Sequence, residues 1–298
     1  MASAKGLHFN RILEVAPPEF LFVVSAMAQY GGAVIAVKLF DEVSPATVAY
    51  IRVIAASAIL IGFSVRRSHP RWTRRDLAWA AAFGCATALM NLLFYLAIDR
   101  LPMGKGVTIE FIGPITVAAL RTRTLRNTSA LVLATIGVLV LGGVELGNEP
   151  LGLVYILGAS VMWAGYIVMG SRVALGDRGV SGLGIGLFFG AILITPFGIG
   201  DVHKAISAPH LLLAAALVGL LSNAIGYGID QSTLRRIPIR RFSILLALLP
   251  VCAAIFGFLF LSQTPTLIDL CGMTLVLIGV AVQERDQLQR HHQEVETT

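Results

Sequence analysis

Residues 103–120 read MGKGVTIEFIGPITVAAL, an apolar run with a single carboxylate, Glu110, near its middle. As a helix, a run of this length crosses about 30 Å of hydrocarbon, which places Glu110 close to the midplane of a bilayer. A carboxyl group at that depth is costly unless it is protonated, paired with a base or facing a water-filled cavity. The run therefore predicts a membrane helix that keeps a carboxylate for a functional reason.

The rest of the chain has the same apolar character. Of 298 residues, 56% are hydrophobic and 13% are charged, too few charges for the surface of a soluble protein. The runs are continuous rather than alternating, which predicts helices and not the strands of a barrel. We expect an all-α membrane protein with ten transmembrane helices: 19–40, 44–65, 77–98, 102–120, 128–147, 151–171, 181–200, 209–230, 239–261 and 265–283.

Basic residues are concentrated in alternate loops. They gather on one predicted side, at 66–75, 121–126 and 235–241. The opposite side holds few, namely Arg100, Lys105 and Lys204. Because short cytoplasmic loops carry the excess of Lys and Arg, we expect both termini in the cytoplasm and a multi-pass protein of the cell's inner membrane. This distribution accounts for the net charge of +6 without a nucleic-acid partner.

Two stretches indicate an internal repeat. Residues 97–114 (AIDRLPMGKGVTIEFIGP) align with residues 233–250 (TLRRIPIRRFSILLALLP) at an offset of 136, and prolines coincide at two positions. A second alignment, at an offset of 134, pairs Gln29 with Trp163. Each half then holds five spans, and an odd number makes the second half enter the membrane upside down. Secondary transporters with inverted repeats have this plan, with the site between the halves near the midplane.

The repeat divides the chain into four parts. We expect a cytoplasmic N-terminal segment at 1–18, five-helix repeats at 19–147 and 151–283, and a cytoplasmic tail at 284–298. Glu110 has no acidic counterpart in the second repeat, where Leu246 stands at the equivalent position. A carboxylate present in one half only is a better candidate for chemistry than for scaffolding.

The stretch MNLLFYLAI at 90–98, followed by Leu101-Pro102 and by IEFIGP at 109–114, resembles the EamA-type domains of the drug/metabolite transporter superfamily. In detail it is most similar to the bacterial threonine and homoserine exporters. Further matching positions extend the resemblance over nearly the whole chain: Gly31-Gly32, Arg52 and Trp163-Ala164. The resemblance implies export of amino acids or related metabolites, driven by the proton gradient. Its partners would be a small-molecule substrate, protons and the lipid bilayer, with no cofactor.

Glu110 lies four residues before Pro114. Proline lacks a backbone donor and leaves the carbonyl of Glu110 without its helical partner, while Gly113 loosens the same turn. Pro250 is the repeat's counterpart to Pro114. A carboxylate beside unpaired carbonyls suits an ammonium group or a proton. The alternative is a packing carboxyl neutralised by Arg52 or Lys38.

Arg52 stands about 12 Å from the outer end of the second span, at 1.5 Å per residue. It could bind a substrate carboxylate, pair with Glu110, or extend to the outer surface. Other polar or amphipathic residues within spans could line a cavity or could serve packing: Asn91, Tyr95, Gln29, Trp163 and Tyr166. Gln29-Tyr30 stands where many relatives have a tryptophan, so the cavity wall is expected to differ from theirs.

Several other features have simpler readings. Gly182, Gly186 and Gly190 form a ridge that suits close helix packing within the monomer, with a homodimer contact as the alternative.

The string GIGD at 198–201 matches intramembrane aspartyl proteases, but no second catalytic carboxylate motif accompanies it. Hydrolase and nucleotide-binding signatures are absent, so we expect no enzyme. The three cysteines lack metal-type spacing, and we expect neither a metal site nor a disulfide.

The sequence therefore predicts an inner-membrane transporter that exports small amino acids, with threonine and homoserine first, by proton antiport. Two alternatives stay open. One is a broad-specificity exporter of aromatic amino acids or other metabolites. The other is a passive channel.

Overall fold

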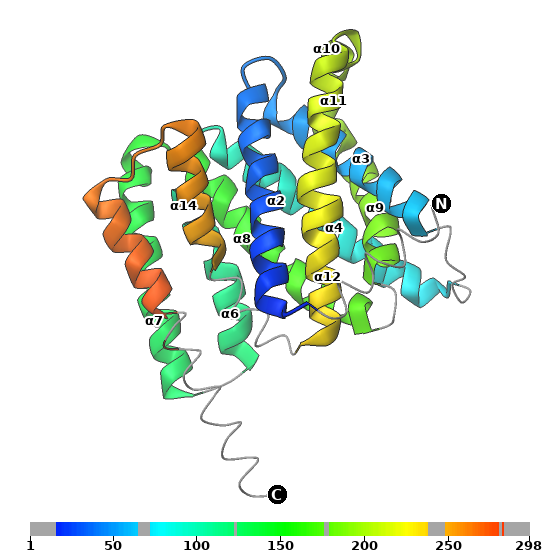
Figure 1. Cartoon of the computed structure of the whole chain (residues 1–298). Helices are drawn as coiled ribbons and strands as arrows, with labels where there is room; N and C mark the ends of the chain where they lie inside the picture. The colour runs from blue at the N-terminus through cyan, green and yellow to red at the C-terminus, as the bar shows by residue number, and fades with distance from the viewer. Residues whose placement is uncertain are drawn as a thin grey trace, which may run out of the picture.

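The computed structural model describes residues 16–64, 72–121, 124–175, 179–237, 248–279 and 282. Every regular element in this part of the chain is a helix (Figure 1). Six of these helices are long and apolar enough to cross a membrane, and further apolar helices are shorter. The all-helical class predicted from the sequence is therefore confirmed. The predicted cytoplasmic ends at 1–18 and 284–298 lie almost wholly outside the described residues.

The helices of the first half are α2 (Pro18–Leu39), α3 (Pro45–Ser64), α4 (Arg74–Ile98), α5 (Met103–Glu110), α6 (Ile112–Arg121) and α7 (Leu125–Asn148). Those of the second half are α8 (Pro150–Val173), α9 (Gly179–Gly198), α10 (Val202–Ser207), α11 (Pro209–Val218), the π-helical η2 (Gly219–Gly226), α12 (Tyr227–Arg236) and α14 (Leu248–Leu261). A last apolar helix spans Leu267–Gly279. Four helices begin at a proline, whose missing N–H costs nothing in the first turn.

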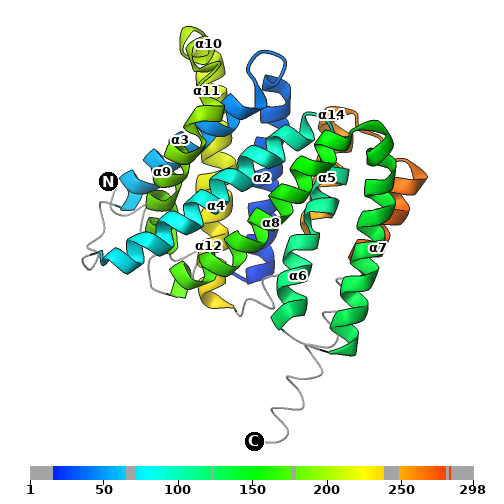
Figure 2. The ribbon, with the colours of Figure 1, turned by 180° about the vertical axis from the view of Figure 1, so that it is seen from behind.

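Two predicted spans are interrupted. The span at 102–120 divides into α5 and α6 at Phe111, three residues before Pro114 (Figure 2). The span at 209–230 runs further than predicted: α11, η2 and α12 follow one another to Arg236. In a π-helical segment the backbone hydrogen bonds span five residues instead of four, and such segments often occur at functional sites. The span at 239–261 is described only from Leu248 onward.

Glycines allow α4 and α9 to touch through their backbones. A Cβ atom built on Gly84 would lie 1.8 Å from the carbonyl carbon of Gly186, and one on Gly190 would lie 2.5 Å from the carbonyl oxygen of Gly84. Such contacts between small residues replace hydrophobic driving force as the source of helix association in lipid. The glycines of α9 thus pack within the monomer at Gly186 and Gly190.

Helices of the first half of the chain pack mainly on helices of the second half. The helix α4 lies along α8 and α9, as Figure 2 shows, and α11 with η2 lies along α2 and α3. In addition, α3 contacts α9, and α5 contacts α14. The helix α8 contacts α5 and α6, while α2 contacts α14. Most contacts that position the centre of the molecule therefore join one half to the other.

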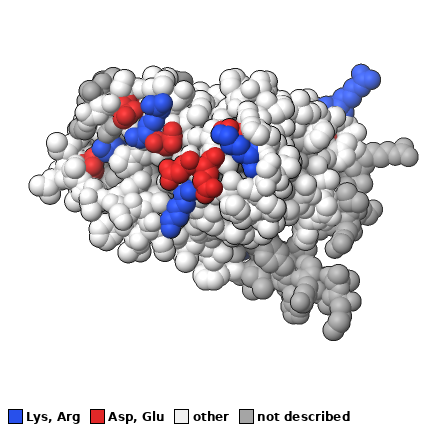
Figure 3. Space-filling view, turned by 90° about the horizontal axis from the view of Figure 1, so that it is seen from above, with Lys and Arg blue, Asp and Glu red and all other residues white. Residues whose placement is uncertain are grey.

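The upper end of the molecule carries paired charges on a mostly uncharged surface (Figure 3). Arg100 lies 3.4 Å from Glu149, and Lys204 lies 2.8 Å from Asp201. The Lys204 ammonium, together with hydrogen bonds from Ser44, holds the pKa of Asp201 below its ordinary value. These contacts tie together the loops at this end.

A buried ion pair joins α5 to the last helix. The Lys105 ammonium lies 2.8 Å from the Asp269 carboxylate, and both side chains are less than a tenth exposed. The side chain of Asp269 also caps its own helix by accepting from the backbone N–H of Thr266. The sequence placed Lys105 on the outward side, near the start of the predicted span 102–120, without a partner. The carboxylate of Asp269 is that partner, and it allows the ammonium to lie inside the protein.

We expect Lys105→Met to lower the free energy of unfolding by about 3–5 kcal/mol, because it leaves the Asp269 charge buried without its partner. Replacing both residues by apolar ones should recover most of that loss. Thermal unfolding in detergent checks both. The exposed pair provides a matched control: Arg100→Met should cost no more than about 1 kcal/mol. A Lys105→Met protein as stable as the parent would contradict this prediction.

Candidate functional site

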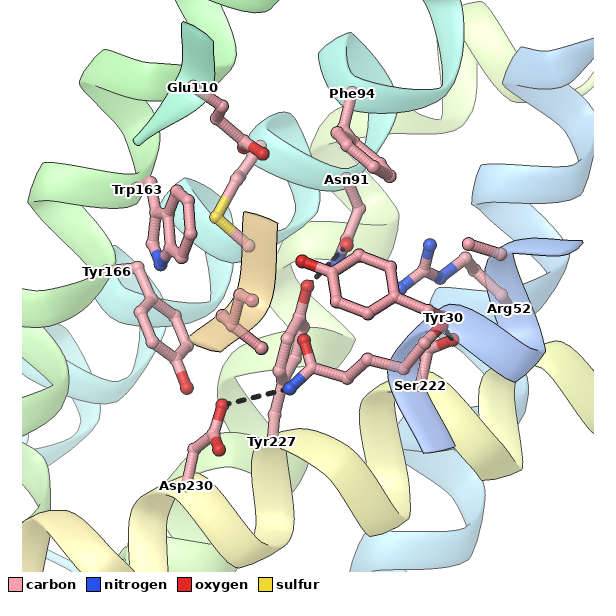
Figure 4. Close-up of a pocket in the computed structure, with 14 residues that line it drawn as sticks. Tyr30, Arg52, Asn91, Phe94, Glu110, Trp163, Tyr166, Ser222, Tyr227 and Asp230 are labelled. Atoms are coloured by element: carbon pink, nitrogen blue, oxygen red, sulfur yellow. Dashed lines mark hydrogen bonds between the residues drawn. The ribbon is translucent and has the colours of Figure 1, made fainter. Parts of the chain in front are cut away.

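A cavity of about 50 Å³ lies where helices of both halves meet (Figure 4). At about 10–15 Å³ for each water, it has room for a few water molecules. Side chains from α2, α3, α4, α5, α8, η2, α12 and α14 line it: Gln29, Tyr30, Ala33, Arg52, Met90, Asn91, Phe94, Glu110, Trp163, Tyr166, Ser222, Tyr227, Asp230 and Leu249. The cavity thus contains nearly all the polar residues predicted for the site.

Tyr95 is the predicted site residue that does not line the cavity. Its ring lies behind Arg52, with the guanidinium carbon 4.5 Å from the ring centroid. Phe40 packs edge-on against the same ring at 5.5 Å. Tyr95 therefore supports Arg52 through a cation–π contact rather than facing the cavity itself.

Arg52 is held inside the protein and does not extend to the outer surface. Its side chain is 3% exposed. The guanidinium donates from Nε to Asn223 Oδ1 at 2.8 Å, and its Nη2 donates to the same oxygen. Asn223 belongs to η2, so this contact joins the second span of the first half to the π-helical segment of the second half. It leaves part of the guanidinium facing the cavity (Figure 4).

Glu110 is the last residue of α5, and its carboxylate points into the cavity from the wall opposite Arg52 (Figure 4). The residue is 5% exposed. Within the described part of the chain, no side chain forms an ion pair with it, although the charge of Arg52 acts on it from across the cavity. Lys38, the other base considered for neutralising it, lies exposed at the end of α2.

The helix break places Glu110 at this position. Gly113 and Pro114 form the first turn of α6, and Pro114 cannot donate to the carbonyl of Glu110. A Cβ atom on Gly113 would lie 2.2 Å from the carbonyl oxygen of Ser160, so glycine allows α6 to pack against α8. Pro250 is buried in the first turn of α14, and the residues that precede that helix lie outside the described ranges.

Several polar groups at the cavity lack protein partners. Tyr227 donates its hydroxyl to Asn91 Oδ1 at 2.9 Å, whereas Asn91 Nδ2 and the Tyr166 hydroxyl have no hydrogen-bond partner within the described residues. Buried polar groups are normally hydrogen-bonded, so groups of this kind at a cavity are suited to bind a ligand or water. Trp163 packs edge-on against Phe111 at 5.7 Å and forms an apolar wall.

Asp230 is a functional candidate that sequence reasoning missed. It lies in α12, is 2% exposed, and accepts hydrogen bonds from Ser25 at 2.8 Å and from Gln29 at 3.3 Å. The predicted span ended at residue 230, which made this carboxylate look like a boundary residue. The continuation of α12 to Arg236 puts it inside the span instead. The basic pair Arg235-Arg236, of the kind that marks the cytoplasmic end of a span, is a sequence signal that could have placed Asp230 inside it.

Long apolar helices around a cavity with buried charges define a multi-pass membrane transporter. The chain belongs to the EamA-like transporter family, whose model matches residues 17–146 and again residues 150–283. Members of this family are transporters and not enzymes, as the sequence predicted. The family and the apolar helices also agree with the predicted location in the inner membrane.

Curated relatives are similar over most of their length. The chain is 30% identical over 263 residues to the threonine/homoserine exporter RhtA of Escherichia coli (strain K12), covering 87% of this chain and 88% of the relative. It is 29% identical over 286 residues to RhtA of Salmonella typhimurium (strain LT2), covering 94% and 96%. A solved crystal structure with 16% sequence identity has the same fold, with a TM-score of 0.60 over 89% of this chain and 96% of that chain.

Proposed function

We propose that the protein exports small amino acids of the threonine and homoserine type across the inner membrane, in exchange for protons. The observation that carries the proposal is the placement of opposite charges on facing walls of one small cavity: Glu110 on α5 and Arg52 on α3. A zwitterionic amino acid has the complementary pair of charges. The relatives named above support the substrate class.

Each charged group of the substrate has a counterpart at the cavity. The ammonium would bind Glu110, whose own backbone carbonyl has no N–H partner at Pro114. The carboxylate would bind Arg52, which Asn223 and Tyr95 hold in position. A hydroxyl on the substrate side chain would reach Asn91 or Tyr166, whose free polar atoms are at the cavity. The small volume favours a small solute.

The packing supports ten crossings in two inverted repeats. If each helix is replaced by its counterpart in the other half, the contacts of α4 with α8 and α9 correspond to those of η2 with α2 and α3. The α3–α9 and α5–α14 contacts then correspond to themselves. Asn91 and Tyr227, which are 136 residues apart, touch each other as residues near a two-fold axis would. Two similar bundles can exchange conformations, so the cavity would open alternately to either side.

Export is then driven by the flow of protons from the more acidic outside into the cytoplasm. The substrate enters from the cytoplasm and binds between Glu110 and Arg52. After reorientation, a proton from the more acidic outside neutralises Glu110, which weakens the contact with the ammonium and releases the substrate. The proton must leave toward the cytoplasm before the next cycle. Because Glu110 binds either the substrate or a proton, the exchange of substrate for proton couples substrate export to proton entry.

Counterflow of labelled threonine in proteoliposomes tests the proposal. We expect Glu110→Gln to lower the rate about 100-fold, because removing one partner of a buried charge pair costs about 2–5 kcal/mol and each 1.4 kcal/mol is about tenfold. Glu42→Gln, at an exposed position in the loop after α2, is the control and should match the parent. A Glu110→Gln protein that exchanges threonine and responds to pH as the parent does would refute the assignment. Counterflow by the parent would also exclude a passive channel.

A second solute class has an observation in its favour. Aromatic side chains make up much of the cavity wall: Tyr30, Phe94, Trp163, Tyr166 and Tyr227. Such rings would suit an aromatic side chain by offset stacking. Competition decides between the classes, since unlabelled phenylalanine should inhibit threonine counterflow weakly if the small-solute proposal is right and strongly if it is wrong.

A further inference from the structure

We propose that Asp230 is a second proton site, through which the proton taken up at Glu110 leaves toward the cytoplasm. This inference rests on the proposed antiport and assigns its inward half to a residue. The two carboxylates come from different halves of the chain and line the same cavity, Glu110 from α5 and Asp230 from α12 (Figure 4).

The two carboxylates lie at different depths. Glu110 is seven residues from the start of α5, about 10 Å below the upper end at 1.5 Å per residue. Asp230 is six residues from the end of α12, about 9 Å from the opposite end. In the predicted orientation, the upper end is the outside and the end of α12 is the cytoplasmic side. Each acid is thus nearer to one of the two solutions.

The hydrogen bonds around Asp230 accommodate both of its protonation states. Ser25 has one hydroxyl proton but two acceptors, the carbonyl oxygen of Gly226 at 3.0 Å and Asp230 Oδ1 at 2.8 Å. If Asp230 is ionised, Ser25 donates to it. If Asp230 carries a proton, it donates to Ser25, which turns to donate to Gly226. Gln29 donates to Ser25 at 2.9 Å and to Asp230 Oδ2 at 3.3 Å, contacts that persist in both states.

Among the residues that the structure describes, no base lies against Asp230 that would hold it permanently ionised. The helices packed against α12 are α2, α8, α9 and η2. Of these, α9 and η2 have no titratable residue, α2 presents Tyr30, and α8 presents Tyr166. Within α12 itself, Tyr227 faces the cavity, whereas Arg235 and Arg236 are exposed at the helix end. Glu110 differs, because the charge of Arg52 acts on it. Within the described residues, the two acids therefore have different partners.

Hydroxyl groups occupy the space between the two acids. Tyr30 and Tyr227 line the cavity between Glu110 and Asp230 (Figure 4). The Tyr166 hydroxyl points toward Asp230 (Figure 4). In the transfer, the O–H bond of protonated Glu110 breaks and an O–H bond forms on ionised Asp230, by way of these hydroxyls or of water in the cavity. Asp230 then releases the proton to cytoplasmic water, and both acids are again ionised.

The test separates substrate exchange from proton coupling in proteoliposomes containing the full chain. Threonine counterflow requires substrate binding and reorientation but no net proton release, whereas threonine transport driven by a pH gradient requires both. We expect Asp230→Asn to keep counterflow within about twofold of the parent and to lose at least about tenfold of the gradient-driven rate. Asp230→Glu, which retains a titratable group, should keep gradient-driven transport. Glu110→Gln should lose both activities.

Each other result overturns the proposal in an identifiable way. Asp230→Asn with normal gradient-driven transport shows that no proton passes through this residue. A folded, monodisperse Asp230→Asn protein that loses counterflow as well shows that Asp230 binds substrate or supports the cavity instead. If the parent itself shows no threonine counterflow, the proposed substrate is wrong, and the role of Asp230 is then tested by the same two assays with labelled phenylalanine, the solute of the second class.

Ser25→Ala provides a second variant in case Asp230→Asn does not fold. It removes the hydroxyl that hydrogen-bonds Asp230 in both protonation states and leaves the carboxyl in place. A hydrogen bond to an ionised group is about twice as strong as a neutral one, so the ionised state loses more. We expect the pH profile of gradient-driven transport to move to higher pH, with counterflow unchanged. An unchanged profile overturns the role given to the Ser25–Asp230 contact.

Discussion

Gly84→Leu is expected to leave no folded transporter in the membrane. A Cβ atom at this position would lie 1.8 Å from the carbonyl carbon of Gly186 and 1.9 Å from its oxygen. These are backbone atoms of α9, so no side-chain rotation can relieve the overlap. Overpacking typically costs about 1–3 kcal/mol where side chains can move, and here the two helices must separate instead.

Separation of α4 from α9 would affect the whole core. Gly186 and Gly190 both contact α4, and α4 in turn packs along α8 and carries Asn91 to the cavity. The measurement is the yield of monodisperse protein by fluorescence-detected size exclusion. Gly62→Leu is the matched control, because the Cβ of Gly62 would meet nothing within 4 Å. Normal yield of Gly84→Leu would show that these helices do not need their close contact.

Arg52→Lys is expected to lower threonine counterflow about 100-fold without loss of folded protein. Arginine donates to Asn223 Oδ1 from two nitrogens while its face rests on the ring of Tyr95. Lysine keeps the charge but lacks the planar guanidinium with its several fixed N–H donors. The ammonium would therefore leave the Asn223 oxygen incompletely paired and would not present donors to the substrate carboxylate.

Arg172→Lys is the matched control for this prediction. Arg172 also stacks on an aromatic ring, with its guanidinium carbon 4.6 Å from the ring centroid of Trp79, but it is exposed and does not line the cavity. Its replacement should leave counterflow within about twofold of the parent. Equal effects of the two replacements would show that Arg52 acts through general stability. Unchanged counterflow in Arg52→Lys would show that the position needs a charge but not a guanidinium.

Sequence patterns that depend on local chemistry were sufficient for the class of protein and for most of the cavity. Runs of apolar residues identify membrane helices because the bilayer requires them over a fixed length. Polar residues inside such runs, including Glu110, Arg52 and Asn91, stand out because burying them is costly. The structure places these three at one cavity.

Positions near the ends of helices were harder to predict. Asp230 was the last residue of the predicted span 209–230 and Lys105 lay near the start of the predicted span 102–120, where hydropathy changes gradually and gives little guidance. The first lies within a helix that continues through a π-helical segment to Arg236, and the second pairs with Asp269, which is far away in sequence. Neither a backbone irregularity nor a distant counter-ion is visible in local composition.

By itself, the sequence determined that the chain is a helical membrane protein of a transporter family, because length, hydropathy and a duplicated motif are properties of single segments. The tertiary structure decided which polar residues share a cavity and which support them. It brought Asp230 beside Ser25 and Gln29, and it placed Tyr95 behind Arg52. These relations depend on how helices from the two halves cross, and the close contacts that set those crossings, such as Gly84 with Gly186, join residues far apart in the chain.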